Sequence, residues 1–204
     1  MIPKDQIGQR LLLAFSGKNE LPKEILEAIE EFKPAGFTLF RSMNIDSPSQ
    51  VRHLVTLLQN KAAELQIPGF LIGLDQEGGQ LMAVGDATPL PGNMALGATR
   101  DSKLAYEAGR VIGTEMSAHG VNLVYAPCAD VNNNPLNPVV GIRSFGDDPV
   151  LVSEMTRAMI EGIQSCGVIA TVKHFPGHGD TSTDSHHGLG VVPHPIERLR
   201  QVEL

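Results

Sequence analysis

The stretch SKLAYEAGRVIGTEMSAHGVNLVYAP (Ser102–Pro127) decides the fold, because two hydrophobic periods follow each other within it. Up to residue 118 the apolar residues recur at helical spacing, and from Val121 they form one short unbroken run. Gly120 stands between the two, where a helix commonly ends on a left-handed glycine. Unbroken apolar runs of this length are typical of parallel strands covered on both faces. The stretch therefore predicts a helix that leads back into a buried parallel strand.

The same order of helix, glycine and apolar run occurs three more times. Helical spacing is present in PKEILEAIEEF, PSQVRHLVTLLQNKAAEL and PVLVSEMTRAMIEGIQ, and the runs that follow are AGFTLF, PGFLIGLD and CGVIATVKH. With LLLAF (residues 11–15) as a first strand and PIERLRQVEL (195–204) as a last helix, the sequence predicts five strand–helix units. Such a chain is α/β, with right-handed crossovers.

Polar, glycine-rich segments follow the predicted strands, whereas the connections from helix to strand are short. The chemistry therefore lies on one rim, at the carboxyl ends of the strands, in either a (β/α)8 barrel or an open doubly wound sheet. Two observations favour the TIM-type barrel. SGKNELP, after the first strand, is not a glycine-rich phosphate fingerprint, and the long loops follow consecutive strands. Because a barrel of eight units needs about 250 residues, we expect residues 1–204 to be part of one barrel domain, with five of eight units, ending inside a helix.

Composition limits the classes of partner and compartment. The formal net charge of −7 and a pI near 5.4 argue against nucleic acid as a partner. The short apolar run LLLAF predicts a strand and neither a signal peptide nor a membrane span. Cys128 and Cys166 lie in apolar surroundings without metal-type spacing, which predicts buried free thiols in a reducing compartment. We therefore expect a cytoplasmic protein.

The segment VKHFPGHGDTSTDSHHGLG (Val172–Gly190) holds four of the seven histidines. Lys173 and His174 end the fifth predicted strand, and a lysine there needs a partner for its ammonium group. Adjacent strand residues point in opposite directions, but at a strand end the backbone can turn both towards the rim. The Phe175–Pro176 bond can be cis at the sharp turn, and His178 is expected to anchor the loop.

Two acidic residues also follow strands. Asp75, in LDQEGG, is either a turn or helix-capping residue or a carboxylate that accepts hydrogen bonds from paired hydroxyls of a ligand. Glu77 and the glycines after it are expected to hold that loop close to the backbone. Asp130, at the end of the fourth strand, is expected only to brace the asparagine turn that follows.

The long loop ADVNNNPLNPVVGIRSFGDD carries a lone cation, Arg143. Loops of this length without secondary structure are uncommon and tend to be functional. Arg143 is therefore a candidate ligand-binding residue. The alternative is a surface pair with Asp147 or Asp148.

Asp184 and His186 are two residues apart in an extended loop, so that both side chains lie on one side. The carboxylate can then accept the imidazole Nδ1–H and raise the basicity of Nε2. The loop DTSTDSHHG lacks an apolar anchor and is expected to be mobile and able to close over a substrate. A solvated loop with an Asx turn remains the alternative.

A metal site is the less favoured interpretation of the histidines. His174 and His178 form an H-x-x-x-H pattern, but Pro176 and Gly177 between them prevent the helix on which such a pair works. No acidic partner completes a zinc set from these two histidines together with His186 and His187. We expect neither a metal nor another cofactor.

Together, LDQEGG, NPLNPVVGIRSFGDDP, KHFPGHG and DSH resemble the N-terminal catalytic barrel domain of family 3 glycoside hydrolases, most closely its bacterial β-N-acetylglucosaminidase branch. The resemblance runs from the first strand to the end of the chain. It implies that four residues grip the hydroxyls of the sugar in the −1 subsite: Asp75, Arg143, Lys173 and His174. The substrate it implies is a small carbohydrate, an N-acetylglucosaminide from muropeptides or chitin.

The resemblance also implies a mechanism. Asp184 and His186 match an Asp–His dyad in which the histidine replaces the acid/base carboxylate of most retaining glycosidases. Two departures stand out. The family's nucleophilic aspartate lies on a later strand, and no residue here matches it. Gln80 and Ala83 stand where well-known enzymes of this branch carry arginines that contact the sugar.

The leading hypothesis is thus an exo-acting, retaining β-N-acetylglucosaminidase. A β-glucosidase or phosphorylase of the same family is a neighbouring possibility, and a non-catalytic sugar-binding or scaffold protein is the alternative from another class. The 204 residues by themselves are expected to be inactive. They are also expected to expose strand edges and to self-associate, or to pair with a chain that supplies the remaining strands.

Overall fold

The computed structural model describes residues 4–204, and its centre is a parallel sheet of five strands in the order β1-β2-β3-β6-β7. The strands are β1 (Leu12–Leu13), β2 (Gly36–Thr38), β3 (Leu71–Leu74), β6 (Leu123–Val124) and β7 (Ile169–Ala170). Every neighbouring pair is parallel. The five predicted strands are therefore confirmed as an α/β fold. Within residues 4–204 the strand order follows the chain without reversal.

Burial differs between the middle of the sheet and its two edges. Phe37, Ile72 and Val124 in the central strands are fully buried. In the outermost strands, Leu12 is 39% exposed and Ile169 is 46% exposed. Coverage on both faces, expected from the unbroken apolar runs, is thus confirmed for the centre and wrong for the edges.

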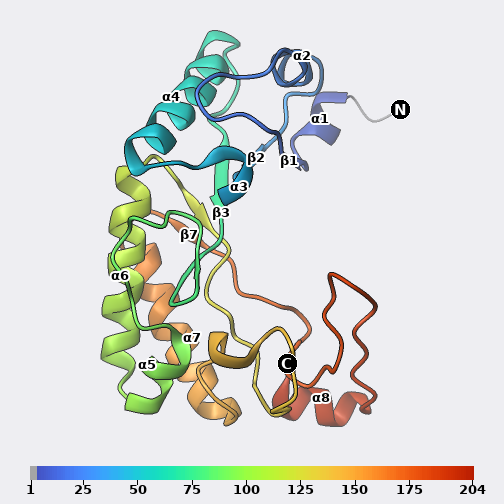
Figure 1. Cartoon of the computed structure of the whole chain (residues 1–204). Coiled ribbons are helices and arrows are strands. Elements are labelled where there is room, and N and C mark those ends of the chain that lie inside the picture. The colour runs from blue at the N-terminus through green and yellow to red at the C-terminus, as the bar shows by residue number, and fades with distance from the viewer. Residues whose placement is uncertain (1–3) are drawn as a thin grey trace.

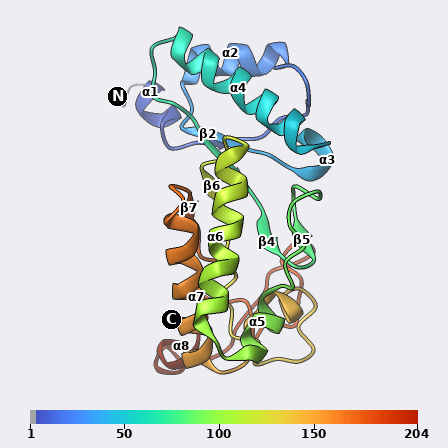
Figure 2. The ribbon, with the colours of Figure 1, turned by 90° about the vertical axis from the view of Figure 1, so that its left-hand side faces the viewer.

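The helices predicted from hydrophobic spacing are all present. Helices α4, α6 and α7 lie along one side of the sheet (Figure 1), and the view turned by 90° shows α6 and α7 side by side (Figure 2). The predicted helices are α2 (Lys23–Phe32), α4 (Pro48–Glu64), α6 (Ser102–Ala118), α7 (Pro149–Gln164) and α8 (Ile196–Val202). Elements without a sequence prediction are α1 (Lys4–Gly8), α3 (Arg41–Asn44), the hairpin β4 (Gln76–Gly78) with β5 (Leu81–Met82), α5 (Asn93–Thr99) and the 3-10 turn Gly141–Arg143.

Glycines allow α6 and α7 to cross closely. A Cβ at Gly109 would lie 2.3 Å from the carbonyl oxygen of Met159, and one at Gly162 would lie 2.1 Å from that of Tyr106. Each helix therefore presents a glycine to the backbone of the other. Any side chain at these positions would push the helices apart, and close packing of this kind tolerates little added volume.

The glycines after the helices have two different roles. Gly120 and Gly167 are left-handed, as expected, with φ of +79° and +76°. After α2 and α4 the left-handed residues are instead Lys33 and Gln66, so the expectation is wrong there. Gly36 lies inside β2, where a Cβ would be 1.9 Å from the carbonyl oxygen of Leu71 on β3. That glycine serves strand pairing and not helix termination.

The structure bears on the predictions for the N-terminus and the cysteines. LLLAF contains β1, while residues 1–3 lie outside the described part. Cys128 is a buried free thiol, but Cys166 is only partly buried, because it lies in the turn after α7 with its sulfur 3.4 Å from Thr114 Oγ1. Across residues 4–204, no helix combines the length and apolarity that crossing a membrane requires.

Candidate active site

The carboxyl ends of β3, β6 and β7 bring polar residues from distant parts of the chain together. Asp75 directly follows β3, and an isolated parallel bridge pairs Cys128 with Lys173 beyond the carboxyl ends of β6 and β7. In parallel sheets the carboxyl ends of neighbouring strands meet at one edge, which is where ligands bind. The rim expected from the loops is therefore confirmed.

Glu77 is the centre of a cluster with Asp75, Arg143 and Lys173, the strand-end cluster. Its side chain is only 2% exposed, and Arg143 donates to it twice, from Nε to Oε2 over 2.9 Å and from Nη2 to Oε1 over 2.6 Å. Lys173 Nζ lies 2.5 Å from the same Oε1 and 2.5 Å from Asp75 Oδ1. Burial raises the pKa of Glu77, but the hydrogen bond from Arg143 and the charge of Lys173 outweigh burial and hold the pKa below its usual value. Glu77 thus stays ionised between two cations.

The environment of Arg143 decides between its two interpretations. It is paired with Glu77, and the hydrogen bond to that carboxylate raises the pKa of the guanidinium. Asp148 instead caps α7, where its Oδ1 accepts from the backbone N–H of Val150 over 3.0 Å. A surface pair between Arg143 and Asp147 or Asp148 is therefore wrong.

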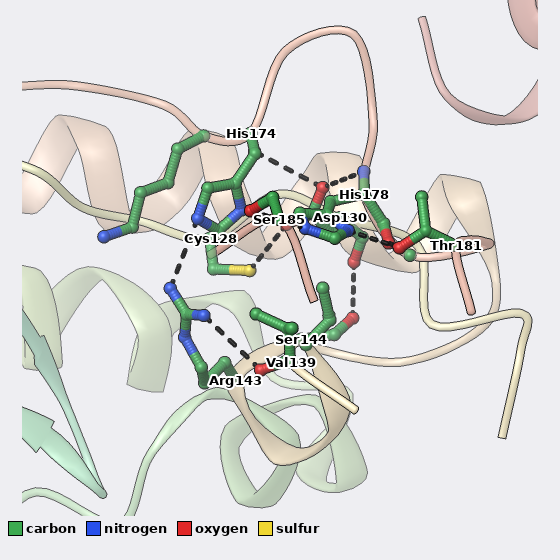
Figure 3. A network of polar contacts seen from close by, with 12 residues as sticks. Cys128, Asp130, Val139, Arg143, Ser144, His174, His178, Thr181 and Ser185 are labelled. Atoms are coloured by element: carbon green, nitrogen blue, oxygen red, sulfur yellow. Dashed lines mark hydrogen bonds and ion pairs between the residues drawn. The ribbon is translucent and has the colours of Figure 1, made fainter. Parts of the chain in front are cut away.

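Lys173 and His174 both reach the rim, as expected for residues at a strand end. The peptide bond between them is cis, and so is the bond between Phe175 and Pro176. Lys173 contacts Asp75, while His174 Nε2 lies 3.3 Å from Arg143 Nη2 (Figure 3). The ammonium group of Lys173 thus has the partner that its buried position requires.

Asp130 holds His174 in place, a role beyond the turn bracing expected for it. Its side chain is fully buried, and its Oδ2 lies 2.5 Å from His174 Nδ1 (Figure 3). Burial raises the pKa of Asp130, but the hydrogen bond with His174 and the backbone N–H of His178 outweigh burial and lower it. Asp130 is therefore a carboxylate in direct contact with a candidate binding residue.

His178 anchors the loop, as predicted. It is 8% exposed, and its Nδ1 lies 2.5 Å from Thr181 Oγ1. Asn137 donates from Nδ2 to the carbonyl oxygens of His178 and Thr181, over 2.7 and 3.0 Å. A Cβ at Gly179 would lie 1.8 Å from the carbonyl oxygen of Val131, so glycine is required where the two long loops touch.

Asp184 and His186 form the predicted pair. His186 Nδ1 lies 2.7 Å from Asp184 Oδ1, and the same oxygen accepts the backbone N–H of His186 over 2.9 Å. The second contact is the Asx turn of the alternative interpretation, so both geometries are present at once. The backbone N–H and the side chain of His186 together lower the pKa of Asp184. The imidazole is 79% exposed, which leaves its Nε2 open to a ligand.

Polar contacts, and not apolar ones, connect the loop of this pair to the cluster. Ser185 Oγ lies 3.2 Å from His178 Nε2, and the rings of His178 and His174 meet edge to face at 5.7 Å (Figure 3). Thr181, at the start of the loop, is 4% exposed. The absence of an apolar anchor was therefore a poor guide to how the loop is held, and its mobility stays a prediction.

A cavity of about 340 Å³ adjoins the cluster. Glu77 and Arg143 form one wall, and Gln80 also lines it. Ala83, by contrast, is buried, and its backbone N–H donates to the carbonyl oxygen of Asp75 over 2.8 Å. Of Gln80 and Ala83, only Gln80 thus lines this cavity.

Among the described residues, Cys128, Asp130 and His174 form a group with the spacing of a metal site, their ligand atoms lying within 4.8 Å of one another. Hydrogen bonds account for this proximity, because Cys128 Sγ donates to Asp130 Oδ2 over 3.2 Å. Burial raises the pKa of the Cys128 thiol, which opposes the thiolate that zinc would need. The guanidinium of Arg143 beside His174 opposes a further cation as well.

Sequence reasoning missed the importance of Glu77 and Asp130. Glu77 lies three positions past β3, within the hairpin strand β4, and Asp130 lies six positions past β6. Burial of an acid requires a partner, and the unpaired cations Arg143 and Lys173 in the neighbouring loops were the available signal.

Comparison with known sequences identifies the family. The profile of the glycosyl hydrolase family 3 N-terminal domain matches residues 4–204. The chain belongs to glycosyl hydrolase family 3. A family 3 β-N-acetylglucosaminidase from Paenibacillus sp. str. FPU-7 is similar over 100% of the chain and 38% of its own, with 46% identity and a TM-score of 0.95. NagZ from Neisseria gonorrhoeae is similar over 94% and 56%, with 28% identity and a TM-score of 0.84.

Among curated sequences, β-hexosaminidase A from Pseudoalteromonas piscicida is 36% identical over 97% of the chain. The chain spans 36% of the length of that relative and 58% of the length of a β-hexosaminidase from Xylella fastidiosa strain M12. The family 3 profile therefore matches all the described residues of the chain, while the relatives are longer.

Proposed function

We propose that the protein to which this chain belongs is an exo-acting β-N-acetylglucosaminidase that hydrolyses its substrate with retention. The observation that carries the proposal is the Asp184–His186 pair in a family 3 chain, with Nδ1 on the carboxylate and Nε2 open. The similar proteins named as β-N-acetylglucosaminidase and β-hexosaminidases support the same substrate class.

In the proposed mechanism, His186 Nε2 donates a proton to the glycosidic oxygen as the bond to the anomeric carbon breaks. Asp184 stabilises the imidazolium form, as a carboxylate does for a histidine base. An aspartate on a later strand, as the resemblance implies, attacks the anomeric carbon to form a glycosyl-enzyme. His186 then takes a proton from water as the water oxygen attacks the anomeric carbon, the bond from that carbon to the aspartate breaks, and the sugar is released with net retention.

The cluster at the strand ends is proposed to bind the sugar of the −1 subsite. Asp75 can accept hydrogen bonds from hydroxyls, while Lys173 and Arg143 can only donate them. Because Glu77 fixes both cations, the site is ordered before a substrate arrives. Such preorganised donors are effective in a site that excludes water.

The test is turnover of an aryl β-N-acetylglucosaminide by the full-length protein. We expect release of the chromophore, and a fall of about 10²- to 10⁴-fold in kcat for His186→Ala. His187→Ala is the matched control, because this neighbouring residue is also exposed and is expected to keep the activity. Equal rates for wild type and His186→Ala would reject the acid/base role.

The same assay separates the neighbouring activities. A rate that requires inorganic phosphate and yields a sugar 1-phosphate would indicate a phosphorylase, and preference for an aryl β-glucoside would indicate a β-glucosidase. Sugar binding without turnover by the full-length protein would favour the non-catalytic alternative.

We further propose that the five strands are part of a (β/α)8 barrel. The sequential strand order, the exposed Leu12 and Ile169 at its two edges, and the greater length of the relatives support this proposal. Residues 1–204 alone are then expected to self-associate, or to pair with a chain that supplies the remaining strands. Light scattering tests this, and a monodisperse monomer of 204 residues would count against it.

The origin of the substrate and the compartment are proposals as well. A muropeptide or chitin-derived N-acetylglucosaminide, cleaved in the cytoplasm during peptidoglycan recycling, agrees with the resemblance and with the reduced Cys128 and Cys166. Cell fractionation and assay on muropeptides, compared with chitin oligosaccharides, distinguish these sources.

A further inference from the structure

Asp130 is surrounded by hydrogen-bond donors. Its Oδ1 accepts the backbone N–H groups of His178, over 2.6 Å, and of His174, over 3.3 Å. Its Oδ2 faces His174 Nδ1 at 2.5 Å and the thiol of Cys128 at 3.2 Å. A fully buried carboxylate with these neighbours acts as an acceptor throughout. The nitrogen of His174 that faces it therefore carries a proton.

The other ring nitrogen of His174 has a neighbour of the opposite kind. Nε2 lies 3.3 Å from Nη2 of Arg143, and a guanidinium group can only donate. Arg143 is held in this position because its Nη2 also donates to Glu77 Oε1 over 2.6 Å. A proton on Nε2 would place two N–H groups against each other. Nε2 therefore presents its lone pair.

From these two contacts we infer that Asp130 is a positioning residue that locks His174 in the Nδ1–H tautomer, so that Nε2 acts only as a hydrogen-bond acceptor. In the ligand-free protein Arg143 Nη2 occupies this lone pair over 3.3 Å, and a ligand hydroxyl that donates to Nε2 takes the place of that long contact. The assignment of that hydroxyl to a sugar rests on the proposed function, whereas the tautomer does not.

Each polar group of the site then has a defined role as hydrogen-bond donor or acceptor. Lys173 and Arg143 can only donate, and the carboxylate of Asp75 can only accept. With Nε2 of His174 as a second acceptor, a ligand hydroxyl between His174 and Arg143 donates to the imidazole while its oxygen accepts the N–H that Arg143 no longer directs at Nε2. A neutral imidazole in the Nε2–H tautomer would have the same shape, but its Nε2 would donate a hydrogen bond where this site requires an acceptor.

The first experiment measures the tautomer by 15N–1H correlation NMR of the histidine rings in the ligand-free protein, with His174→Gln used to assign the signals. We expect the proton of His174 on Nδ1. In Asp130→Asn, the amide oxygen can still accept the backbone N–H of His178, but the NH₂ group then faces His174 Nδ1. Because an NH₂ group can only donate, Nδ1 must accept, and the ring proton should move to Nε2. A wild-type ring protonated on Nε2 or on both nitrogens, or a folded Asp130→Asn variant with an unchanged ring, would overturn the inference.

Two controls separate positioning from a structural role. Cys128→Ser keeps a donor on Asp130 Oδ2 and should leave the His174 tautomer unchanged, and a shift there would contradict the assignment to Asp130. If Asp130→Asn does not fold, the wild-type spectrum alone still decides the tautomer.

The second experiment uses substrate analogues in which one hydroxyl is replaced by hydrogen or by fluorine, since fluorine can accept but cannot donate. The hydroxyl that contacts His174 is the one whose removal lowers kcat/KM in the wild type but has no further effect in His174→Gln. At that position the deoxy and the fluoro analogue should have equally reduced kcat/KM in the wild-type protein. A fluoro analogue that retains wild-type kcat/KM would overturn the acceptor role. Lack of turnover of the parent substrate would instead count against the proposed function and leave the NMR result standing.

Discussion

The strand-end cluster and the Asp184–His186 loop are built in opposite ways. In the cluster, the side chains of Glu77, Arg143 and Lys173 are 2%, 11% and 14% exposed, and each cation is paired with a carboxylate. In the loop, the imidazole of His186 is 79% exposed. The groups proposed to bind the sugar are therefore fixed beforehand, whereas the proposed proton-transfer group lies on a surface segment. Binding can be preorganised without hindering release, while a proton donor on a loop can approach after the sugar is seated.

The largest expected effect comes from breaking the cluster at its centre. Glu77→Gln leaves Arg143 and Lys173 buried with less negative charge, and removing one member of a buried pair commonly costs about 3 kcal/mol or more. Urea denaturation should show this loss, together with a fall of roughly 100-fold or more in kcat/KM as the binding groups shift. Glu27→Gln, in the exposed pair with Lys23, is the control and should leave stability nearly unchanged. Equal effects of the two substitutions would show that the cluster is not preorganised by Glu77.

The next largest effect should separate activity from stability. Asp184→Asn removes the acceptor charge behind His186 and is expected to lower kcat by about 10²-fold while the melting temperature stays the same, because the imidazole that it pairs with is 79% exposed. Asp147→Asn, at an exposed aspartate in the preceding loop, provides the matched control. A large drop in melting temperature would mean that the loop is part of the folded core and would remove the contrast with the cluster.

The pH dependence of stability should follow the cluster. Glu77 and Asp130 have pKa values below their ordinary ones of about 4, so their stabilisation is complete above roughly pH 4.5 and is lost as the pH falls through the lower folded-state values. Urea unfolding between pH 7 and pH 2.5 should show this loss, and Glu77→Gln should show a shallower one. The pKa of Asp184 is lowered too, but its partner His186 is largely exposed and solvent screens the pair, so Asp184→Asn should change the slope less.

The smallest effect is expected at the connection between the two regions. Ser185→Ala removes the contact between Ser185 Oγ and His178 Nε2 and should lower kcat only a few-fold. Limited proteolysis should cut the loop faster in this variant than in Ser182→Ala, at an exposed position of the same loop. Unchanged cleavage would show that Thr181 and the pair of Asp180 with His194 suffice to hold the loop.

The sequence by itself was enough for the parallel strands and their helices. The apolar runs around Ile72 and Val124 are stable only where both faces of the strand are covered, in the middle of the sheet. The helical spacing of the apolar residues in α6 and α7 determines which face of each helix is buried. The pair of Asp184 and His186 could also be predicted, because a contact between residues i and i+2 depends on local geometry alone.

Only the tertiary structure decided which charged residues of the strand-end cluster pair with one another. Glu77 and Arg143 are 66 residues apart, and Asp75 and Lys173 are 98 residues apart, so no local pattern chooses among the possible pairs of charges. The choice follows from the sheet, which places the ends of β3, β6 and β7 at one rim, and from burial, which makes an unpaired charge there costly. For the same reason Asp130, a turn residue by its sequence, became the support of His174.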